Sequence, residues 1–197
     1  CLDSNLYLDP TDAGFQRWIA DDLAGTDAAW KFVVYHHPAF NVGLEHYTEQ
    51  HMRVLSPIFE QHGVSIVLSG HEHNYQRTRP LRFAPAGNGA AARVNDGRRL
   101  VPGRFTVDGR FDGRRVTRPD GVIYLTTGAG GNRLYEPEFT GRPAAWLRPE
   151  DGNVAYVERL IADRHSLTVV DMRPDRLVLR QIDGGGNLLD RIRIDRS

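Results

Sequence analysis

The sequence predicts an α/β fold that ends in an antiparallel meander. Two short apolar runs, residues 30–35 and 64–68, are rich in β-branched and aromatic side chains, which is typical of buried strands. Segments of helical period precede and separate these runs, as expected in an α/β protein. From residue 166 the apolar positions alternate every second residue, which indicates antiparallel strands with one buried face.

A first helix is expected to begin after Pro10. Thr11 or Asp12 can cap it, because their side-chain oxygens accept a hydrogen bond from a backbone N–H of the first turn. Gly25 is expected to end it. Four apolar side chains recur at helical spacing and are predicted to face the core: Phe15, Trp18, Ile19 and Leu23.

Residues 46–62 carry the second helical pattern, after a loop at 39–45. Pro57 lacks a backbone donor and therefore predicts a break, with Ser56 capping a second short helix. The side chains predicted to point inward are Met52, Leu55, Ile58 and Phe59. Three histidines of this stretch are interpreted as ordinary surface or capping residues: His46, His51 and His62.

Residues 84–120 are predicted to form an inserted hairpin, after a short strand at 78–83. Asp108-Gly109 is a favoured two-residue turn, and apolar residues flank it on both sides. Residues 93–118 hold eight arginines and three aspartates. This excess of positive charge indicates either a solvated insertion or a rim that attracts phosphate-bearing substrates.

The remaining segments are predicted to complete the sheet. Residues 121–126 read as a strand, and the glycines at 128–131 let the backbone approach a site closely. Residues 136–152 are expected to be loop, and residues 166–197 the terminal meander. Turns are expected at 173–175 and 184–187. His165 is interpreted as structural. Without internal repeats, residues 1–197 are interpreted as a single domain.

Composition narrows the classes of function. The formal net charge is zero, so no overall basic field favours nucleic acid as a partner. No apolar run is long enough to span a membrane. Cys1 is the single cysteine, which excludes an internal disulfide. Three interpretations exist for a chain beginning there: an arbitrary cut within a strand, which we favour, a lipid-anchored end, or an N-terminal nucleophile.

Histidines follow both of the first two predicted strands. His36 and His37 end the run at 30–35, and His71 and His73 follow the run at 64–68 after Gly70. Open α/β sheets bind ligands at the carboxyl ends of their strands. Imidazole is a versatile metal ligand. The two pairs therefore predict one shared metal site.

These residues carry a family resemblance. Gly70-His71-Glu72-His73-Asn74-Tyr75-Gln76-Arg77 resembles the GHxHxYxR signature of the purple acid phosphatases, a branch of the calcineurin-like metallophosphoesterases. Val33-Val34-Tyr35-His36 is similar to their VxxH motif, and the glycine-rich 126–132 segment to a downstream strand end. The resemblance covers residues 1–135 and implies half of a two-sheet β-sandwich flanked by helices, namely the C-terminal part of a metallophosphoesterase domain.

The resemblance also implies a chemistry. His36 and His71 would bind one metal ion and His73 a second, the ions being iron, zinc or manganese. The two-metal centre would activate a hydroxide that attacks a small phosphate ester. The family's GD, GDxxY and GNHE motifs, which supply aspartate, tyrosine and asparagine ligands, are absent from this sequence. The family further favours a secreted or periplasmic protein.

Several alternatives remain open from the residues. His37 is a candidate catalytic residue that contacts the phosphate or protonates the leaving group, or it is a packed neighbour of His36. Tyr75 and Arg77 are expected to brace the histidine loop. The alternatives to a two-metal phosphoesterase are a mononuclear zinc hydrolase or lyase with His36, His71 and His73 as ligands, an amidohydrolase that uses Cys1, and a catalytically inactive fragment.

Overall fold

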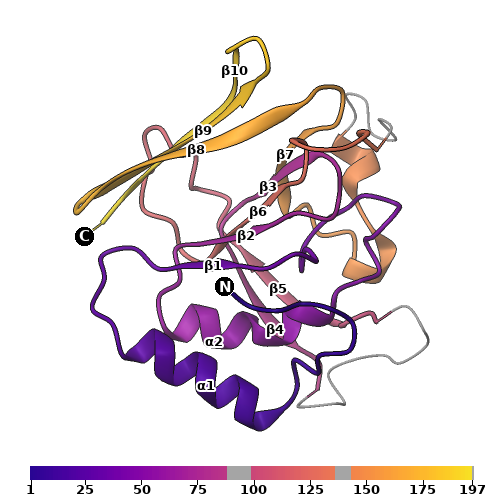
Figure 1. Ribbon diagram of the computed structural model, residues 1–197, viewed down its shortest axis with the longest axis vertical. Helices are drawn as coiled ribbons and strands as arrows, with labels where there is room; N and C mark the ends of the chain where they lie inside the picture. Colours follow the sequence, from indigo (N-terminus) through magenta and orange to yellow (C-terminus); the bar gives the residue numbers. More distant parts are fainter. Residues whose placement is uncertain (88–98, 136–142, 197) are drawn as a thin grey trace.

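A five-stranded mixed sheet forms the centre of the molecule (Figure 1). The computed structural model describes residues 1–87, 99–135 and 143–196. In spatial order the strands are β1 (Phe32–Val34), β2 (Ile66–Ser69), β6 (Ile123–Thr127), β3 (Tyr75–Thr78) and β7 (Val157–Ile161). Strands β1, β2 and β6 run parallel, and β3 runs antiparallel to β6 and β7. The carboxyl ends of three parallel strands therefore meet at one edge.

Two helices lie against one face of this sheet, α1 (Ala13–Ala24) and α2 (Ser56–Gln61) (Figure 1). The predicted cap of α1 is confirmed, because Asp12 Oδ1 accepts the backbone N–H of Phe15 at 2.7 Å. Ile19 and Leu23 are buried as predicted. The prediction for Trp18 is wrong: its side chain is 55% exposed and stacks on Phe15 rather than entering the core.

The second helical stretch begins later than predicted, because residues 46–48 form a turn and the first helical element starts at His51. It is broken as Pro57 predicted. A 3-10 helix at His51–Leu55 leads directly into α2, which has the proline in its first turn. The prediction that Ser56 caps α2 is wrong, because its side chain makes no capping hydrogen bond. The Ser56 hydroxyl instead accepts a hydrogen bond from Tyr124 on β6, at 3.1 Å, and so ties the helix to the sheet.

The strand expected at 78–83 is divided. Strand β3 ends at Thr78, and β4 (Leu81–Pro85) begins a separate two-stranded sheet with β5 (Gly103–Val107). The hairpin expected across Asp108-Gly109 is therefore wrong, since β5 pairs with β4. The Asp108 carboxylate instead accepts the backbone N–H groups of Arg110, Phe111 and Asp120. Residues 88–98, which include Arg93 and Arg98, lie outside the described residues.

The C-terminal meander is confirmed. Strands β8 (Ser166–Arg173), β9 (Arg176–Asp183) and β10 (Leu188–Asp195) form an antiparallel sheet in the order β10-β9-β8. It lies over the face of the main sheet opposite the helices (Figure 1). Its buried side chains pack on those of the main sheet to form one core: Leu177, Leu179, Ile192 and Ile194 with Ile66, Tyr75, Ile123 and Leu125. The fold is thus an α/β sandwich of two sheets with helices outside.

Short segments complete the described chain. Two 3-10 helices, Pro143–Trp146 and Pro149–Asp151, lie in the region expected to be loop. Within the described residues, no helix combines the length and apolar character that crossing a membrane requires.

Tyr75 and Arg77 join the two sheets rather than bracing the histidine loop. The Tyr75 hydroxyl donates to Asp190 of β10 at 2.9 Å, and Arg77 Nε donates to the same carboxylate at 2.6 Å. Burial raises the pKa of Asp190, but hydrogen bonds and charge attraction from Arg77 outweigh it, so the net pKa lies below 3.8. The pair therefore stabilises the fold while Asp190 is ionised.

Replacing Asp190 with asparagine is expected to lower the free energy of unfolding by about 1.5–3 kcal/mol at neutral pH, the range for hydrogen bonds to charged groups. Because the folded pKa is depressed, this stabilisation is present above pH 3.8 and is lost as pH falls through the folded value. Urea denaturation over a pH series measures both effects. If the free energy of unfolding fell equally steeply at acid pH in wild type and in Asp190→Asn, this assignment would be contradicted.

Candidate metal centre

Three of the predicted site residues lie together at the carboxyl edge of the main sheet. His36 follows β1 and His71 follows β2, and these strands are parallel neighbours. The Nε2 atom of His36 lies 3.0 Å from Nδ1 of His71. The ring of His37 lies 4.4 Å from that of His71, centroid to centroid. Neighbouring parallel strand ends thus bring together residues that are 35 positions apart in sequence.

His71 has a strained backbone. Its φ angle is +61°, in the left-handed region that β-carbon-bearing residues seldom adopt. Gly70 was expected to make this turn, but the histidine takes the left-handed conformation. Such strain persists where surrounding contacts fix the backbone, and it gathers at functional sites. The turn aims the imidazole back toward the end of β1.

Glu49 fixes the protonation of His71. Its Oε2 atom lies 2.9 Å from His71 Nε2, and a carboxylate can only accept, so Nε2 carries the hydrogen. The lone pair of Nδ1 then faces His36. The hydrogen bond to His71 lowers the pKa of Glu49. A carboxylate behind a metal-binding histidine is the usual second layer of such sites.

The donor arrangement fits a metal ion. Two nitrogens 3.0 Å apart, each about 2.1 Å from one ion, would make an angle of about 90° at it, as adjacent ligands of an octahedral ion do. A second grouping is also possible on geometry, since donor atoms of His37, Glu49 and His71 lie within 4.8 Å of one another. It is the one such group of three found among the described residues. In that grouping Glu49 would bind the ion itself.

His73 lies apart from this group. Its Nδ1 lies 2.8 Å from the carbonyl oxygen of Arg133, so Nδ1 donates and Nε2 keeps its lone pair. The ring stacks on Tyr135, with centroids 4.2 Å apart and planes at 15°. A backbone carbonyl that orients the imidazole leaves His73 able to bind a metal. It is not a member of the three-residue donor group.

His46 belongs to the centre, and its interpretation as a surface residue is wrong. Its ring centroid lies 3.7 Å from that of His71, and its Nε2 lies 3.2 Å from the Tyr135 hydroxyl. Burial, followed by the charge of His71, lowers the pKa of His46. Sequence reasoning missed Glu49 and Tyr135. The spacing of His46 and Glu49, three residues apart in a helical pattern, was the available signal.

Ser4 holds His37 in place. Its Oγ atom accepts the backbone N–H groups of His36 and His37 and lies 3.0 Å from His37 Nδ1. Burial, then the charges of His71 and His51, lowers the pKa of His37 to about 4. His51 is also buried, contrary to its interpretation as a surface residue, and its Nε2 donates to the Ser4 carbonyl at 2.8 Å.

The histidine loop packs tightly on the glycine-rich end of β6. A β-carbon on Gly128 would lie 2.2 Å from the carbonyl oxygen of Glu72, which lies between His71 and His73. The Gly128 N–H also donates to the Asn74 carbonyl at 3.1 Å. The expectation of close backbone approach at this position is therefore confirmed. A β-carbon on Gly131 would meet no atom of the described residues within 4 Å, and the φ angle there is not left-handed.

Replacing Gly128 with alanine is expected to lower the free energy of unfolding by about 1–3 kcal/mol, because the backbone of the histidine loop must shift. Metal affinity should fall with it. The matched change, Gly131→Ala, should stay within about 0.5 kcal/mol of wild type. Chemical denaturation and metal titration of both variants measure these effects, and equal behaviour of the two would show that the loop is free to move.

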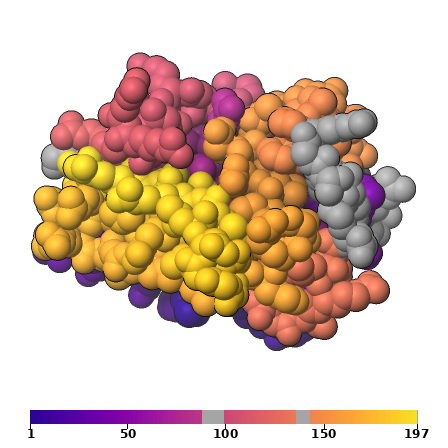
Figure 2. Space-filling model, turned by 90° about the horizontal axis from the view of Figure 1, so that it is seen from above, coloured from indigo at the N-terminus to yellow at the C-terminus, as the bar shows by residue number. Residues whose placement is uncertain are grey.

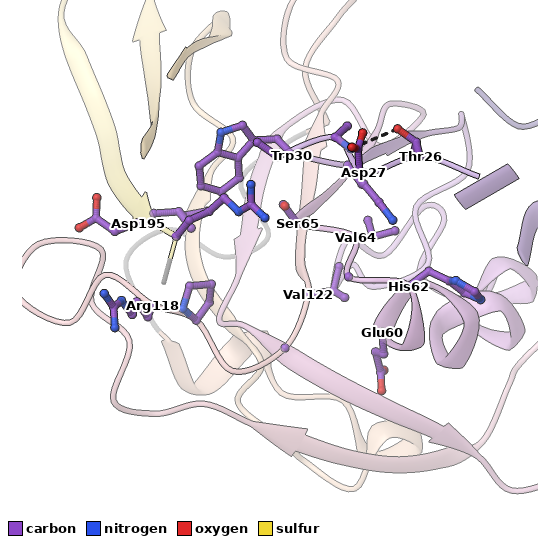
Figure 3. Close-up of a pocket in the computed structure, with 18 of the residues that line it drawn as sticks. Thr26, Asp27, Trp30, Glu60, His62, Val64, Ser65, Arg118, Val122 and Asp195 are labelled. Atoms are coloured by element: carbon purple, nitrogen blue, oxygen red, sulfur yellow. Dashed lines mark hydrogen bonds between the residues drawn. The ribbon is translucent and has the colours of Figure 1, made fainter. Parts of the chain in front are cut away.

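Away from the histidines, a cavity lies at the opposite edge of the sheet, where β1, β2 and β6 begin (Figure 3). Its volume is about 680 Å³, and Trp30, His62, Ser65 and Arg118 are among its lining residues. Open α/β sheets bind their ligands at the carboxyl ends of strands, and this cavity is at the amino ends. The only described group of three metal donors also lies elsewhere, at the histidines, which makes that edge of the sheet the candidate metal site.

Comparison with known proteins shows which family this chain resembles. Residues 2–75 match the family model of the calcineurin-like phosphoesterases. A purple acid phosphatase of Glycine max is 34% identical over 159 residues, which cover 73% of this chain and 33% of that protein. Purple acid phosphatase 18 of Arabidopsis thaliana is 29% identical over 121 residues, 59% of this chain and 21% of that protein.

Solved structures show the same fold. A purple acid phosphatase from yellow lupin seeds superposes with a TM-score of 0.57 at 16% identity, over 93% of this chain and 28% of that one. The chain thus spans about a fifth to a third of the relatives it matches.

Proposed function

Because this chain is a member of the calcineurin-like phosphoesterase superfamily and is similar to its purple acid phosphatase branch, we propose that it forms the histidine half of a two-metal phosphoesterase centre. The observation that carries the proposal is the pair of imidazole nitrogens 3.0 Å apart, with Glu49 behind one of them. Metal-dependent hydrolysis of a small phosphate ester is the reaction these groups support best.

Each histidine has a proposed role. His36 and His71 bind one ion, and His73, oriented by the Arg133 carbonyl, binds the other. Bound iron, zinc or manganese ions would neutralise the charge of the phosphate ester and favour attack on phosphorus. Aspartate and asparagine ligands would come from sequence that precedes this chain in the domain.

The surrounding side chains position these groups. Glu49 holds the His71 ring by its Nε2–H, and Ser4 holds the His37 ring by its Nδ1. His37 lies beside His71 and is the proposed contact to the phosphate or the leaving group. His46 packs on the His71 ring and contacts the Tyr135 hydroxyl. It would therefore line the metal site together with Tyr135.

A mononuclear zinc hydrolase is the second candidate. The donor group of His37, Glu49 and His71 favours it, since three ligands with an open fourth position suit catalytic zinc. The two proposals differ in the role of Glu49 and in the number of ions. Glu49 supports His71 in the two-metal proposal and binds the ion itself in the mononuclear one. Loss of His73 should leave the mononuclear site intact and should impair the two-metal site.

A phosphatase assay on the complete gene product tests the function. With p-nitrophenyl phosphate as substrate, we expect activity that a chelator abolishes and that added metal restores. Activity indifferent to the chelator would refute metal-dependent hydrolysis.

The similarity to the purple acid phosphatases also favours an exported protein. Cell fractionation with an antibody to this chain would test the location.

A further inference from the structure

A groove lined by arginines lies on the outer face of the C-terminal meander. Figure 2 shows this side of the molecule, with β8 in orange and β10 in yellow. The volume of the groove is about 590 Å³, and it shares no lining residue with the histidine centre. Its charged lining consists of four arginines and one aspartate: Arg173, Arg176, Arg180, Arg191 and Asp171. The lining therefore carries a strong excess of positive charge.

The strand register places these arginines against one another. Arg191 of β10 is directly opposite Arg180 of β9, and Arg173 of β8 is directly opposite Arg176 of β9. Like charges in directly opposite positions destabilise an antiparallel pair. Two such pairs in one groove are unfavourable unless a negative charge lies between them.

The protein itself supplies part of that charge, because Asp195 of β10 is directly opposite Arg176. Asp171 pairs with Arg180 at 2.6 Å. Within residues 1–87, 99–135 and 143–196, no salt bridge is formed by Arg173, Arg176 or Arg191. The groove thus presents two guanidinium groups, those of Arg173 and Arg191, without a salt bridge in the described chain. The charge of Arg176 helps to lower the pKa of the Asp195 carboxylate.

Arg180 adds a second indication of a ligand. Its Nε atom is buried and has no hydrogen-bond partner among the described residues, although the side chain as a whole is 39% exposed. Burying a donor without an acceptor is costly, and native proteins seldom leave one so. An anion seated in the groove would pair with the exposed part of this guanidinium and would lie between the opposed arginines.

We propose that this groove binds a short linear polyphosphate, free in solution. Guanidinium groups match phosphate oxygens in geometry as well as in charge. Arg176 and Arg180 are four residues apart on β9, which places the two arginine pairs about 13–14 Å apart along the strand. One orthophosphate reaches one pair, whereas a chain of linked phosphates reaches both. This site is separate from the proposed phosphoesterase centre and does not depend on its activity.

The shape of the groove favours a slender anion over a flat surface. The groove is a hollow of about 590 Å³, which a flat membrane surface lying on the meander would not fill. The zero net charge of the chain provides no extended basic field for nucleic acid. Anionic vesicles and single-stranded DNA are therefore the competing ligands in the test.

Calorimetric titration of the purified chain with tripolyphosphate and with a longer linear polyphosphate tests the proposal, in chelator so that the histidine centre holds no metal. We expect the longer chain to bind more tightly. Arg176→Gln/Arg191→Gln should weaken binding by about tenfold or more. The matched control, Arg114→Gln/Arg115→Gln, removes the same charge from an exposed loop and should bind like wild type.

Thermal unfolding supplies a second readout. Without ligand, the groove variant should melt within about 4 °C of wild type, because the repulsion between opposed arginines is removed together with the attraction between Arg176 and Asp195. Polyphosphate should raise the melting temperature of wild type and not that of the variant. Three results would overturn the proposal: unchanged binding by the groove variant, loss of binding in the Arg114/Arg115 control, or tighter binding to phosphatidylserine vesicles or single-stranded DNA.

Discussion

Replacing His71 with alanine in the complete gene product should lower phosphatase activity by more than about 100-fold, beyond the range seen when a residue that merely supports a ligand is lost. His71 contributes the nitrogen that faces His36 at 3.0 Å, and it receives the support of Glu49. Its removal therefore takes away a proposed ligand and leaves the Glu49 carboxylate with only its longer contact among the described residues, to His46 Nδ1 at 3.6 Å. Metal content should fall together with activity.

The backbone of His71 complicates this experiment, and a second variant resolves it. Alanine at a φ of +61° keeps a strained conformation, at a cost of about 1–2 kcal/mol. Asparagine tolerates the left-handed region better, so His71→Asn should fold like wild type and still lose the metal. His62→Ala, at the opposite edge of the sheet, is the matched control. An active His71→Asn variant that keeps its full metal content would disprove the role of this residue.

Removing the guanidinium of Arg53 should cause the largest loss of stability in the molecule. Arg53 Nη1 and Nη2 donate to the two oxygens of Asp151 at 2.6 and 3.0 Å, and its Nε donates to the carbonyl of Ala39 at 2.6 Å. The side chains of the pair are only 1% and 3% exposed. Breaking a buried ion pair on one side typically costs about 3–5 kcal/mol, because the other charge stays buried.

Arg53→Met is the variant of choice, because methionine fills much of the space beside Phe40. The guanidinium carbon lies 4.8 Å from the centre of that ring. Replacing both partners, as Arg53→Met/Asp151→Leu, should cost less than the single change, because no charge is then left unpaired. The control is Arg82→Met, which breaks an exposed pair with Asp120 and should cost about 0–1 kcal/mol. Denaturant unfolding compares all three.

This pair also affects the metal centre indirectly. The Ala39 carbonyl that Arg53 holds lies in the loop directly after His36 and His37. The same loop is tied to β3, since Val42 N donates to Gln76 Oε1 at 3.0 Å. A variant that folds without the Arg53–Asp151 pair should therefore bind metal less tightly, and metal titration of the double variant would measure that loss.

Local patterns predicted the parts of the fold that local physics determines. The cap of α1 depends on Asp12 and the next three residues, and the meander depends on two-residue alternation. The placing of His36 and His71 needed only that parallel strands end at one edge. These features were therefore readable from short stretches of sequence.

Long-range contacts were not readable in the same way. Arg53 and Asp151 are 98 residues apart, and nothing near either one indicates the other. Strand β3 carries polar residues at Gln76 and Arg77 because its side chains bond to a loop and to β10 rather than alternating toward solvent. Tyr135 reaches His46 from a loop 89 positions away.

The proximity of His36 and His71 was thus predicted from the sequence, whereas the side chains around them, such as His46 and Glu49, were not. His46 and Glu49 carry a helical pattern, which described a surface helix equally well. Only the packing of that segment over the strand ends shows that both side chains face the centre. Distinguishing the two interpretations requires the position of His71, which the sequence alone leaves open.

Elemental metal analysis of this chain and of the complete gene product tests the central claim most directly. If the histidines of this chain form one half of a two-metal centre, the complete product should hold two ions per molecule. This chain alone should hold fewer than one. Two tightly held ions in the isolated chain would contradict the account, because its described residues offer a single group of three metal donors.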